Sequence, residues 1–272
     1  MADDEAARAE RRRRIYGPDD LAERPAFAGG FINFGYWAGI PLDGELTVDQ
    51  RIASQRALYD LVLDSLTITP DDRVLEVGCG RGRGAREVLV RAPRSLDGLD
   101  LVPEQVARAQ RSTPEATFTL GSASYIPFPD NTFDRLLSVE AAQHFEDLTA
   151  FAHESARVLA PGGRLAVTTF FARHDDAGPA LAELLDTFAT GLDLAHPIDR
   201  FTADLRAAGF ADVRADRIGE HVWAGLDRWL ALGDHPDRWD RRWIRAAERG
   251  LLDYYLVTAN LPAAPQPAGS GT

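Results

Sequence analysis

The chain has 272 residues, a length that suits one α/β domain with additions, and 45% of them are hydrophobic, enough for a large core. Acidic residues outnumber basic ones by 42 to 30, giving a net charge of −12, which argues against nucleic acid or an anionic membrane as the partner. A small-molecule substrate fits this charge balance better. The oligomeric state is left open between a monomer and a homodimer.

The single cysteine, Cys79, cannot form an internal disulfide, as is typical of proteins from a reducing compartment. No apolar run reaches the length of a membrane span, and the charged N-terminus lacks the apolar core of a secretory signal. We therefore predict a cytoplasmic protein.

Composition divides the chain into three parts. Residues 1–24 are rich in charge, and the run Arg11–Arg14 lies among acids, so we expect a solvated helix or disorder there. Residues 25–261 form the predicted domain. The tail, 262–272, is mostly Pro, Ala, Gly and Ser and is expected to be disordered.

Within the domain, residues 25–47 alternate aromatic residues with glycines. Such a segment either packs on the core as a loop or forms a lid that covers a binding site and excludes water, and we favour the lid. Two further stretches, 172–200 and 219–250, are predicted as helical insertions, and the second carries four of the five tryptophans.

The other segments alternate short apolar runs with helical periodicity. Apolar positions at three- and four-residue spacing predict a first helix over 48–66. Strands are then predicted over 74–77, 95–99, 116–120, 133–139, 165–171, 211–218 and 252–258. Later helices are predicted over 85–91, from residue 103, and over 148–159, 180–189 and 202–208. Strands that alternate with helices indicate an α/β fold with a mostly parallel sheet.

Four glycines at alternate positions, Gly78 to Gly84, follow the first predicted strand and precede a helix. This unit places backbone N–H groups and a helix N-terminus at the carboxyl end of a strand, where open α/β sheets bind ligands. Gly80, Gly82 and Ala85 also satisfy a dinucleotide pattern. However, if Gly78 makes the first tight turn, Arg83 stands where a third small residue belongs.

Four motifs in chain order resemble those of class I S-adenosylmethionine-dependent methyltransferases, particularly enzymes that tailor small-molecule natural products. They are 74–82, 96–100, 121–123 with 126–134, and 157–165. The resemblance implies a Rossmann-like, seven-stranded, mostly parallel sheet with helices on both faces and an antiparallel last strand. It also implies S-adenosyl-L-methionine as the cofactor.

Nine residues are predicted to bind this cofactor. Asp100 ends the second strand, where a carboxylate can accept both ribose hydroxyls. The family commonly has an acid where Ser122 stands, so we expect a weaker contact to adenine there. Glu140 either faces the methionine end of the cofactor or begins a helix. The full set is Gly78, Cys79, Gly80, Asp100, Leu101, Gln105, Ser122, Ala123 and Glu140.

His144 follows the fourth strand, where similar O-methyltransferases place a base histidine, and it is the candidate catalytic residue; its alternative role is a structural cap. Related sugar O-methyltransferases often carry an aspartate in the fifth strand, where Thr169 stands here, so a strict His–Asp pair is absent from this pattern. The run His174-Asp175-Asp176 is interpreted as a solvated loop, and no metal site is predicted.

Aromatic residues near the predicted site are expected to form an apolar acceptor pocket, although for the tryptophan-rich stretch 219–250 core packing is an equally good explanation. Those predicted to bind substrate are Tyr36, Trp37, Phe171 and Trp223. We predict methyl transfer to a hydroxyl of an apolar natural product. The alternatives are carbon or nitrogen methylation, a cyclase or isomerase that keeps the scaffold and its cofactor, and a non-catalytic cofactor-binding protein.

Overall fold

A computed structural model gives the fold of residues 2–24, 26–232 and 241–263, with side chains described from residue 7 onward. Most of the predicted tail, residues 264–272, and residues 233–240 of the second insertion lie outside the described part of the chain. Within the described part, no helix has both the length and the apolar character that a membrane span requires.

The centre of the molecule is one seven-stranded sheet with the order β3-β2-β1-β4-β5-β7-β6. Its first five strands are parallel, and β7 runs antiparallel to both β5 and β6. The predicted sheet, including the antiparallel edge, is therefore confirmed. The strands are β1 (Arg73–Val77), β2 (Ser95–Asp100), β3 (Thr117–Leu120), β4 (Phe133–Val139), β5 (Leu159–Ala172), β6 (Ala211–Arg217) and β7 (Leu252–Asn260).

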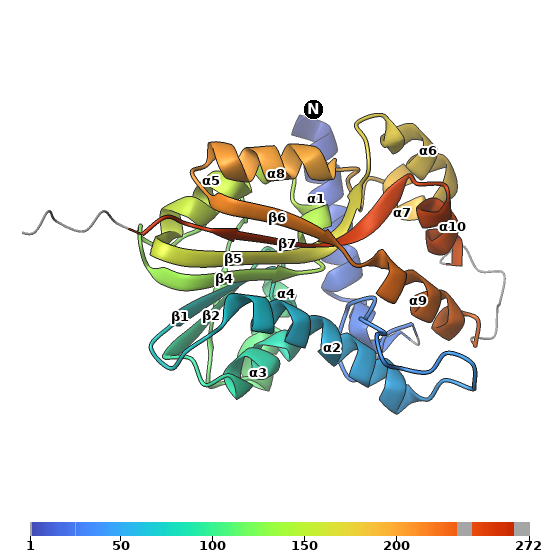
Figure 1. Cartoon of the computed structure of the whole chain (residues 1–272), viewed down its shortest axis with the longest axis horizontal. Helices are drawn as coiled ribbons and strands as arrows, with labels where there is room; N and C mark the ends of the chain where they lie inside the picture. Colours follow the sequence, from blue (N-terminus) through green and yellow to red (C-terminus); the bar gives the residue numbers. More distant parts are fainter. Residues whose placement is uncertain (1, 25, 233–240, 264–272) are drawn as a thin grey trace, which may run out of the picture.

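Helices cover both faces of this sheet (Figure 1). One face packs against α2 (Val48–Leu66), α3 (Arg83–Val90) and α4 (Pro103–Ser112), and the other against α5 (Leu148–Val158) and α8 (Ile198–Ala207). The remaining helical elements are α1 (Ala2–Tyr16), η1 (Leu21–Glu23), η2 (Ala142–His144), α6 (Ala177–Leu184), α7 (Asp186–Ala189), η3 (Gly219–His221), α9 (Trp223–Leu230) and α10 (Arg242–Glu248).

Several predicted boundaries differ from the structure, and two of these differences have a clear physical reason. The strand β5 begins at Leu159, six residues earlier than predicted, because Leu159 pairs with Phe133 of β4. The register between β4 and β5 shifts after this pair, and the shift accommodates the Pro-Gly-Gly residues within the strand. The helix predicted over 180–189 is two helices, since Leu185 adopts an extended conformation between α6 and α7.

The aromatic segment 26–37 is hydrogen-bonded to helix α2, and its role as a lid stays a prediction. The buried guanidinium of Arg51 donates to the carbonyls of Ala26, Asn33 and Phe34 at 2.7–3.2 Å. Gln55 donates to the carbonyl oxygens of this same segment. The buried cation and its carbonyl acceptors thus anchor a segment that has no regular secondary structure.

The acid in the first strand, Glu76, is fully buried, and Tyr59 of α2 donates to its Oε1 at 3.0 Å. Burial disfavours the charged carboxylate and raises the pKa of Glu76 from 4.5 to about 8. In an unfolded chain this group loses its proton near its ordinary pKa, so between about pH 5 and 8 the native state binds more protons. The free energy of unfolding therefore falls as the pH rises through this window.

Replacing Glu76 with Gln should remove this loss, because the amide is neutral at every pH and still accepts from Tyr59. We expect Glu76→Gln to unfold at a higher temperature than the wild-type protein at pH 9, with the difference shrinking toward pH 5. The effect of one such group is at most about 1.4 kcal/mol per pH unit. Thermal unfolding across this pH range measures it, and a constant difference at all pH values would contradict the assignment.

Candidate active site

The glycine loop after β1 depends on backbone conformations that side chains disfavour. Gly78 and Gly82 have φ angles of 78° and 77°, and a Cβ at Gly78 would lie 2.2 Å from the Cβ of Ala141. The Gly78 N–H donates to the Leu99 carbonyl at 2.7 Å, and the Gly80 N–H donates to the Asp100 carboxylate at 2.8 Å. The loop leaves the carboxyl end of β1 and is held by these hydrogen bonds against the carboxyl end of β2.

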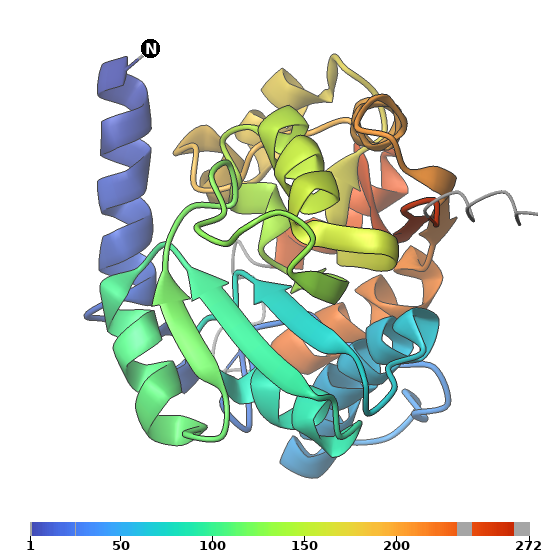
Figure 2. The same ribbon diagram turned by 90° about the vertical axis from the view of Figure 1, so that its left-hand side faces the viewer.

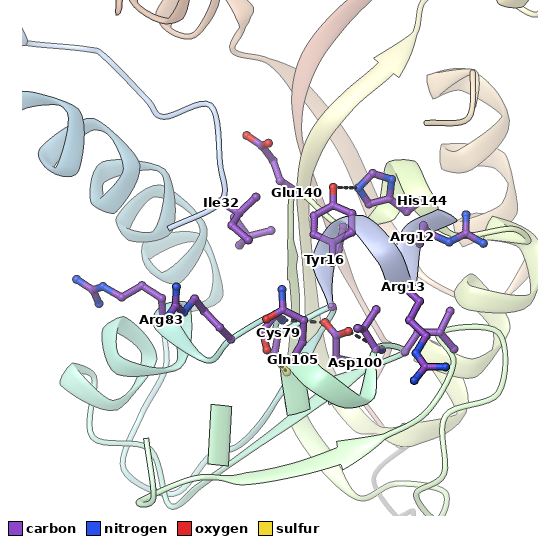
Figure 3. A pocket seen from close by; sticks show the side chains of 18 of the residues that line it. Arg12, Arg13, Tyr16, Ile32, Cys79, Arg83, Asp100, Gln105, Glu140 and His144 are labelled. Atoms are coloured by element: carbon purple, nitrogen blue, oxygen red, sulfur yellow. Dashed lines mark hydrogen bonds between the residues drawn. The ribbon is translucent and has the colours of Figure 1, made fainter. Parts of the chain in front are cut away.

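A cavity of about 570 Å³ opens beside this loop (Figure 3). The ends of β1, β2 and β4 form one side, and residues 30–32 and helix α1 cover the other. Of the predicted cofactor residues, those that line it are Gly78, Cys79, Gly80, Asp100, Leu101, Gln105 and Glu140. The candidate base His144 lines the same cavity.

Asp100 and Gln105 place a carboxylate and an amide in the cavity lining, groups that can form hydrogen bonds with a nucleoside. The Asp100 carboxylate accepts N–H groups from Gly80 and Val102 at 2.8 and 2.9 Å, while burial raises its pKa. Both polar atoms of the Gln105 amide are buried and have no hydrogen-bond partner. Such unpaired groups are costly in a folded protein unless a ligand satisfies them. The residues present therefore fit a ribose and a base.

Glu140 lies on the cavity wall in a strained conformation, with a φ of 45°. Its Oε1 accepts the hydroxyl of Tyr254 at 2.5 Å and the backbone N–H of Phe34. Burial raises the pKa of Glu140 to about 7, against the opposing hydrogen bonds and the nearby charge of Arg51. The Glu140 carboxyl therefore lines the cavity and is also hydrogen-bonded to the aromatic segment 26–37.

Two predicted adenine contacts lie outside the cavity lining. Ser122 forms a short bridge with Tyr125, and its Oγ accepts the N–H of Ser124 at 3.2 Å. Ala123 is buried among the apolar residues of the α5 face. These two assignments stay predictions.

His144 lies in η2, directly after β4, with only 13% of its side chain exposed. Its Nδ1 is 2.9 Å from the Leu192 carbonyl and 3.2 Å from Oδ1 of Asp193. Its Nε2 is 2.8 Å from the Tyr16 hydroxyl (Figure 3). Two oxygen acceptors at Nδ1 place the proton of a neutral ring on that atom and leave the Nε2 lone pair available.

Helix α1 supplies Tyr16 and covers the cavity, although its charged sequence predicted a solvated helix or disorder. Figure 2 shows it along one side of the molecule. Arg8 and Arg12 both pair with Glu146, and Arg13 pairs with Glu104 at 3.1 Å. Arg12 and Arg13 of the arginine run, together with Arg8, therefore attach α1 to the domain, so this face is not wholly solvated.

None of the four predicted substrate contacts lines the described cavity. Tyr36 packs edge-on against His221, and Trp37 is buried with its indole N–H donating to the Phe34 carbonyl at 3.1 Å. Trp223 stacks on Trp243 with ring centroids 6.4 Å apart. Phe171 lies on the opposite face of the sheet, where it stacks on a phenylalanine of α8. These four substrate assignments stay predictions.

Sequence patterns missed Tyr16 and Asp193. Tyr16 ends a segment with little apolar periodicity, and Asp193 lies in an insertion whose path the sequence does not specify. Each reaches His144 from more than forty positions away in the chain. Only the folded arrangement brings them together.

Known proteins resemble this chain in both sequence and fold. A family model described as a methyltransferase domain matches residues 75–167. Erythromycin 3''-O-methyltransferase of Saccharopolyspora erythraea is 33% identical over 226 residues, covering 74% of this chain and 69% of that protein. The 27-O-demethylrifamycin SV methyltransferase of Amycolatopsis mediterranei is 30% identical over 254 residues, covering 86% and 91%.

Among solved structures, the [4+2]-cyclase SpnF has the same fold, with a TM-score of 0.73 over 94% of this chain and 97% of that chain, at 23% identity. The chain belongs to the class I S-adenosylmethionine-dependent methyltransferases, as the glycine loop, Asp100 and the two sequence relatives together establish. It is thus an enzyme, and its cofactor is S-adenosyl-L-methionine.

Proposed function

We propose that this enzyme transfers a methyl group to a hydroxyl of an apolar small-molecule natural product, with His144 as the general base. The observation that carries the proposal is the position of the His144 ring. Its Nδ1 faces two oxygens, and its Nε2 lies at the cavity with a lone pair that accepts hydrogen bonds. A neutral imidazole held in this way can accept a proton from a hydroxyl.

The cofactor would be held along the glycine loop, with Asp100 at its ribose, Gln105 at its base and Glu140 facing the methionine end. When bound, it would supply a methyl group on a positively charged sulfonium. Transfer would break the C–S bond, form a C–O bond, return the electron pair to sulfur and release the proton of the acceptor hydroxyl. The protein's part is to hold the acceptor oxygen in line and to take that proton.

Tyr16 provides the route for that proton. Its hydroxyl lines the cavity and donates to Nε2 of His144 at 2.8 Å. Burial raises the pKa of Tyr16 well above 10, and the nearby carboxylates raise it further, so the phenol keeps its proton. The phenol oxygen of Tyr16 takes the proton of the substrate hydroxyl, while the phenol's original proton passes to Nε2 of His144.

Removing the Tyr16 hydroxyl should therefore slow turnover. We expect Tyr16→Phe to lower kcat about 10- to 100-fold, with the Kd for S-adenosylmethionine unchanged within about twofold. Initial rates at saturating substrate and calorimetric titration of the cofactor measure the two quantities. Tyr125→Phe is the matched control, because Tyr125 is 76% exposed and lies outside the cavity lining. An unchanged or faster kcat would show that Tyr16 only covers the base.

The acceptor class is inferred from the sequence relatives and the cavity wall. Both relatives are named for methylation of antibiotics, and one name specifies an O-methyltransferase. Phe31, Ile32 and Phe145 give the cavity that His144 lines an apolar surface. These features support a hydroxyl on a largely apolar metabolite.

A cyclase or isomerase function is the second candidate, and the name of the structural neighbour SpnF favours it. The two candidates differ in the mass of the product. Methylation adds one methyl group to the acceptor, whereas cyclisation leaves the mass of the substrate unchanged. Carbon and nitrogen acceptors are distinguished from oxygen by locating the new methyl group in the product by nuclear magnetic resonance.

A further inference from the structure

The fifth strand cannot provide a carboxylate to His144. Thr169, which stands where related enzymes often have an aspartate, is fully buried, and its hydroxyl donates to Oε1 of Gln143 at 2.7 Å. The Gln143 amide nitrogen in turn lies 3.1 Å from the Glu140 carbonyl and 3.2 Å from Nε2 of His144. This chain therefore places a neutral network where a charged partner could stand.

The loop between α7 and α8 provides a carboxylate from the opposite side of the ring. Asp193 is 5% exposed, and its Oδ1 lies 3.2 Å from Nδ1 of His144. Its position is set by the backbone, since the N–H groups of Leu192 and Asp193 both donate to the Thr187 carbonyl, at 2.8 and 3.1 Å. The next residue, Leu194, donates to the Gln143 carbonyl at 3.0 Å, which joins the loop to η2.

The groups around the ring specify the roles of its two nitrogens. Nδ1 faces two acceptors, the Leu192 carbonyl and the Asp193 carboxylate, and so carries the proton. Nε2 faces two donors, the Tyr16 hydroxyl and the Gln143 amide, and so accepts. The Leu192 carbonyl alone suffices to fix this tautomer, which leaves the charge of Asp193 as its distinct contribution.

We propose that Asp193 is the positioning residue for the base, a carboxylate from the insertion that replaces the one missing from the fifth strand. The inference rests on the proposed function of His144. When Nε2 takes the proton that Tyr16 passes on from the acceptor hydroxyl, the ring becomes a cation whose Nδ1–H points at Asp193. The carboxyl group of Asp193, 3.2 Å from Nδ1, stabilises that cation in the way that a buried carboxylate supports a catalytic histidine elsewhere. No further reactant is needed.

The test is the substitution Asp193→Asn, which keeps the shape of the side chain and an oxygen acceptor but removes the charge. We expect kcat to fall about 10- to 100-fold, with KM and the Kd for the cofactor unchanged within about twofold. Asp175→Asn is the matched control, because Asp175 is an exposed aspartate of the same insertion, outside the cavity lining. If Asp193→Asn does not fold, Asp193→Ser removes the charge with a smaller side chain.

A second arm separates action through His144 from a structural role. In the His144→Ala background we expect Asp193→Asn to cause no further loss of kcat, because the group through which it acts is already gone. An additional loss in that background would overturn the proposal, as would a wild-type kcat for Asp193→Asn alone. If His144→Ala is itself inactive or slow while Asp193→Asn matches the wild type, only the role of Asp193 fails. If His144→Ala turns over normally, the proposed base fails first.

Discussion

Replacing His144 with alanine is expected to lower kcat by about 10²- to 10⁴-fold, the range typical for loss of a general base. The Nε2 atom is the acceptor that meets the Tyr16 hydroxyl at the cavity, and no other described histidine lines that cavity. The Kd for S-adenosylmethionine should change little, because Asp100, Gln105 and the glycine loop provide the predicted cofactor contacts. The variant thus separates chemistry from binding.

Initial rates at saturating acceptor and cofactor measure this effect, with calorimetric binding of the cofactor as the second readout. His153→Ala is the matched control, since His153 is exposed on α5 and lies outside the cavity lining. A normal kcat for His144→Ala would remove the ring from the mechanism. Equal losses in kcat and cofactor affinity would instead indicate that the ring supports the shape of the site.

The second large effect is expected for Asp100→Ala, which should weaken binding of S-adenosylmethionine about 100-fold or more. Hydrogen bonds to a charged acceptor contribute about 1.5–3 kcal/mol each, and the predicted ribose contact uses two. The substitution also leaves the N–H groups of Gly80 and Val102 without their acceptor, so the loop itself loses order. Both consequences reduce affinity.

Calorimetry with S-adenosylmethionine and with S-adenosylhomocysteine tests this expectation without any acceptor. Asp97→Asn in the same strand is the control, because Asp97 lies outside the cavity lining. An affinity within about twofold of the wild-type value for Asp100→Ala would rule out the ribose assignment. Loss of affinity for both ligands would support it, since both carry the same ribose.

Much of the sheet could be predicted because its central strands are mostly buried. The strands β1, β4 and β7 each contain a short apolar core bounded by turns, so their positions follow from the sequence alone. The start of β5 could not be predicted in this way. A Pro-Gly-Gly turn predicts the end of an element, and only the pairing of Leu159 with Phe133 extends the strand through it.

The cofactor side of the site was predictable for a local reason. Asp100 ends β2, and the glycine loop and Glu140 directly follow β1 and β4, so the sheet itself brings them to one edge. The other side of the site depends on contacts between segments far apart in the chain. Tyr16 and Asp193 meet His144 only because α1 is attached by ion pairs and the insertion loop is held by backbone hydrogen bonds.

The predicted substrate aromatics show why a strand prediction alone cannot place a side chain. Neighbouring residues of a strand point to opposite faces, so a choice between Phe170 and Phe171 needs the register. In the structure Phe170 joins the aromatic cluster with Phe34 and Trp243, while Phe171 joins the opposite face of the sheet. Periodicity finds the strand but does not reveal which face carries the site.

The most direct test of the central proposal is an incubation of the enzyme with methyl-labelled S-adenosylmethionine and a panel of apolar hydroxylated metabolites, followed by mass analysis of cofactor and acceptor. We expect label to appear on an acceptor oxygen, in equal amount to the S-adenosylhomocysteine formed, and we expect His144→Ala to abolish most of this transfer. An acceptor that is converted with unchanged mass while the cofactor stays intact would contradict the proposal and establish a non-methylating reaction instead.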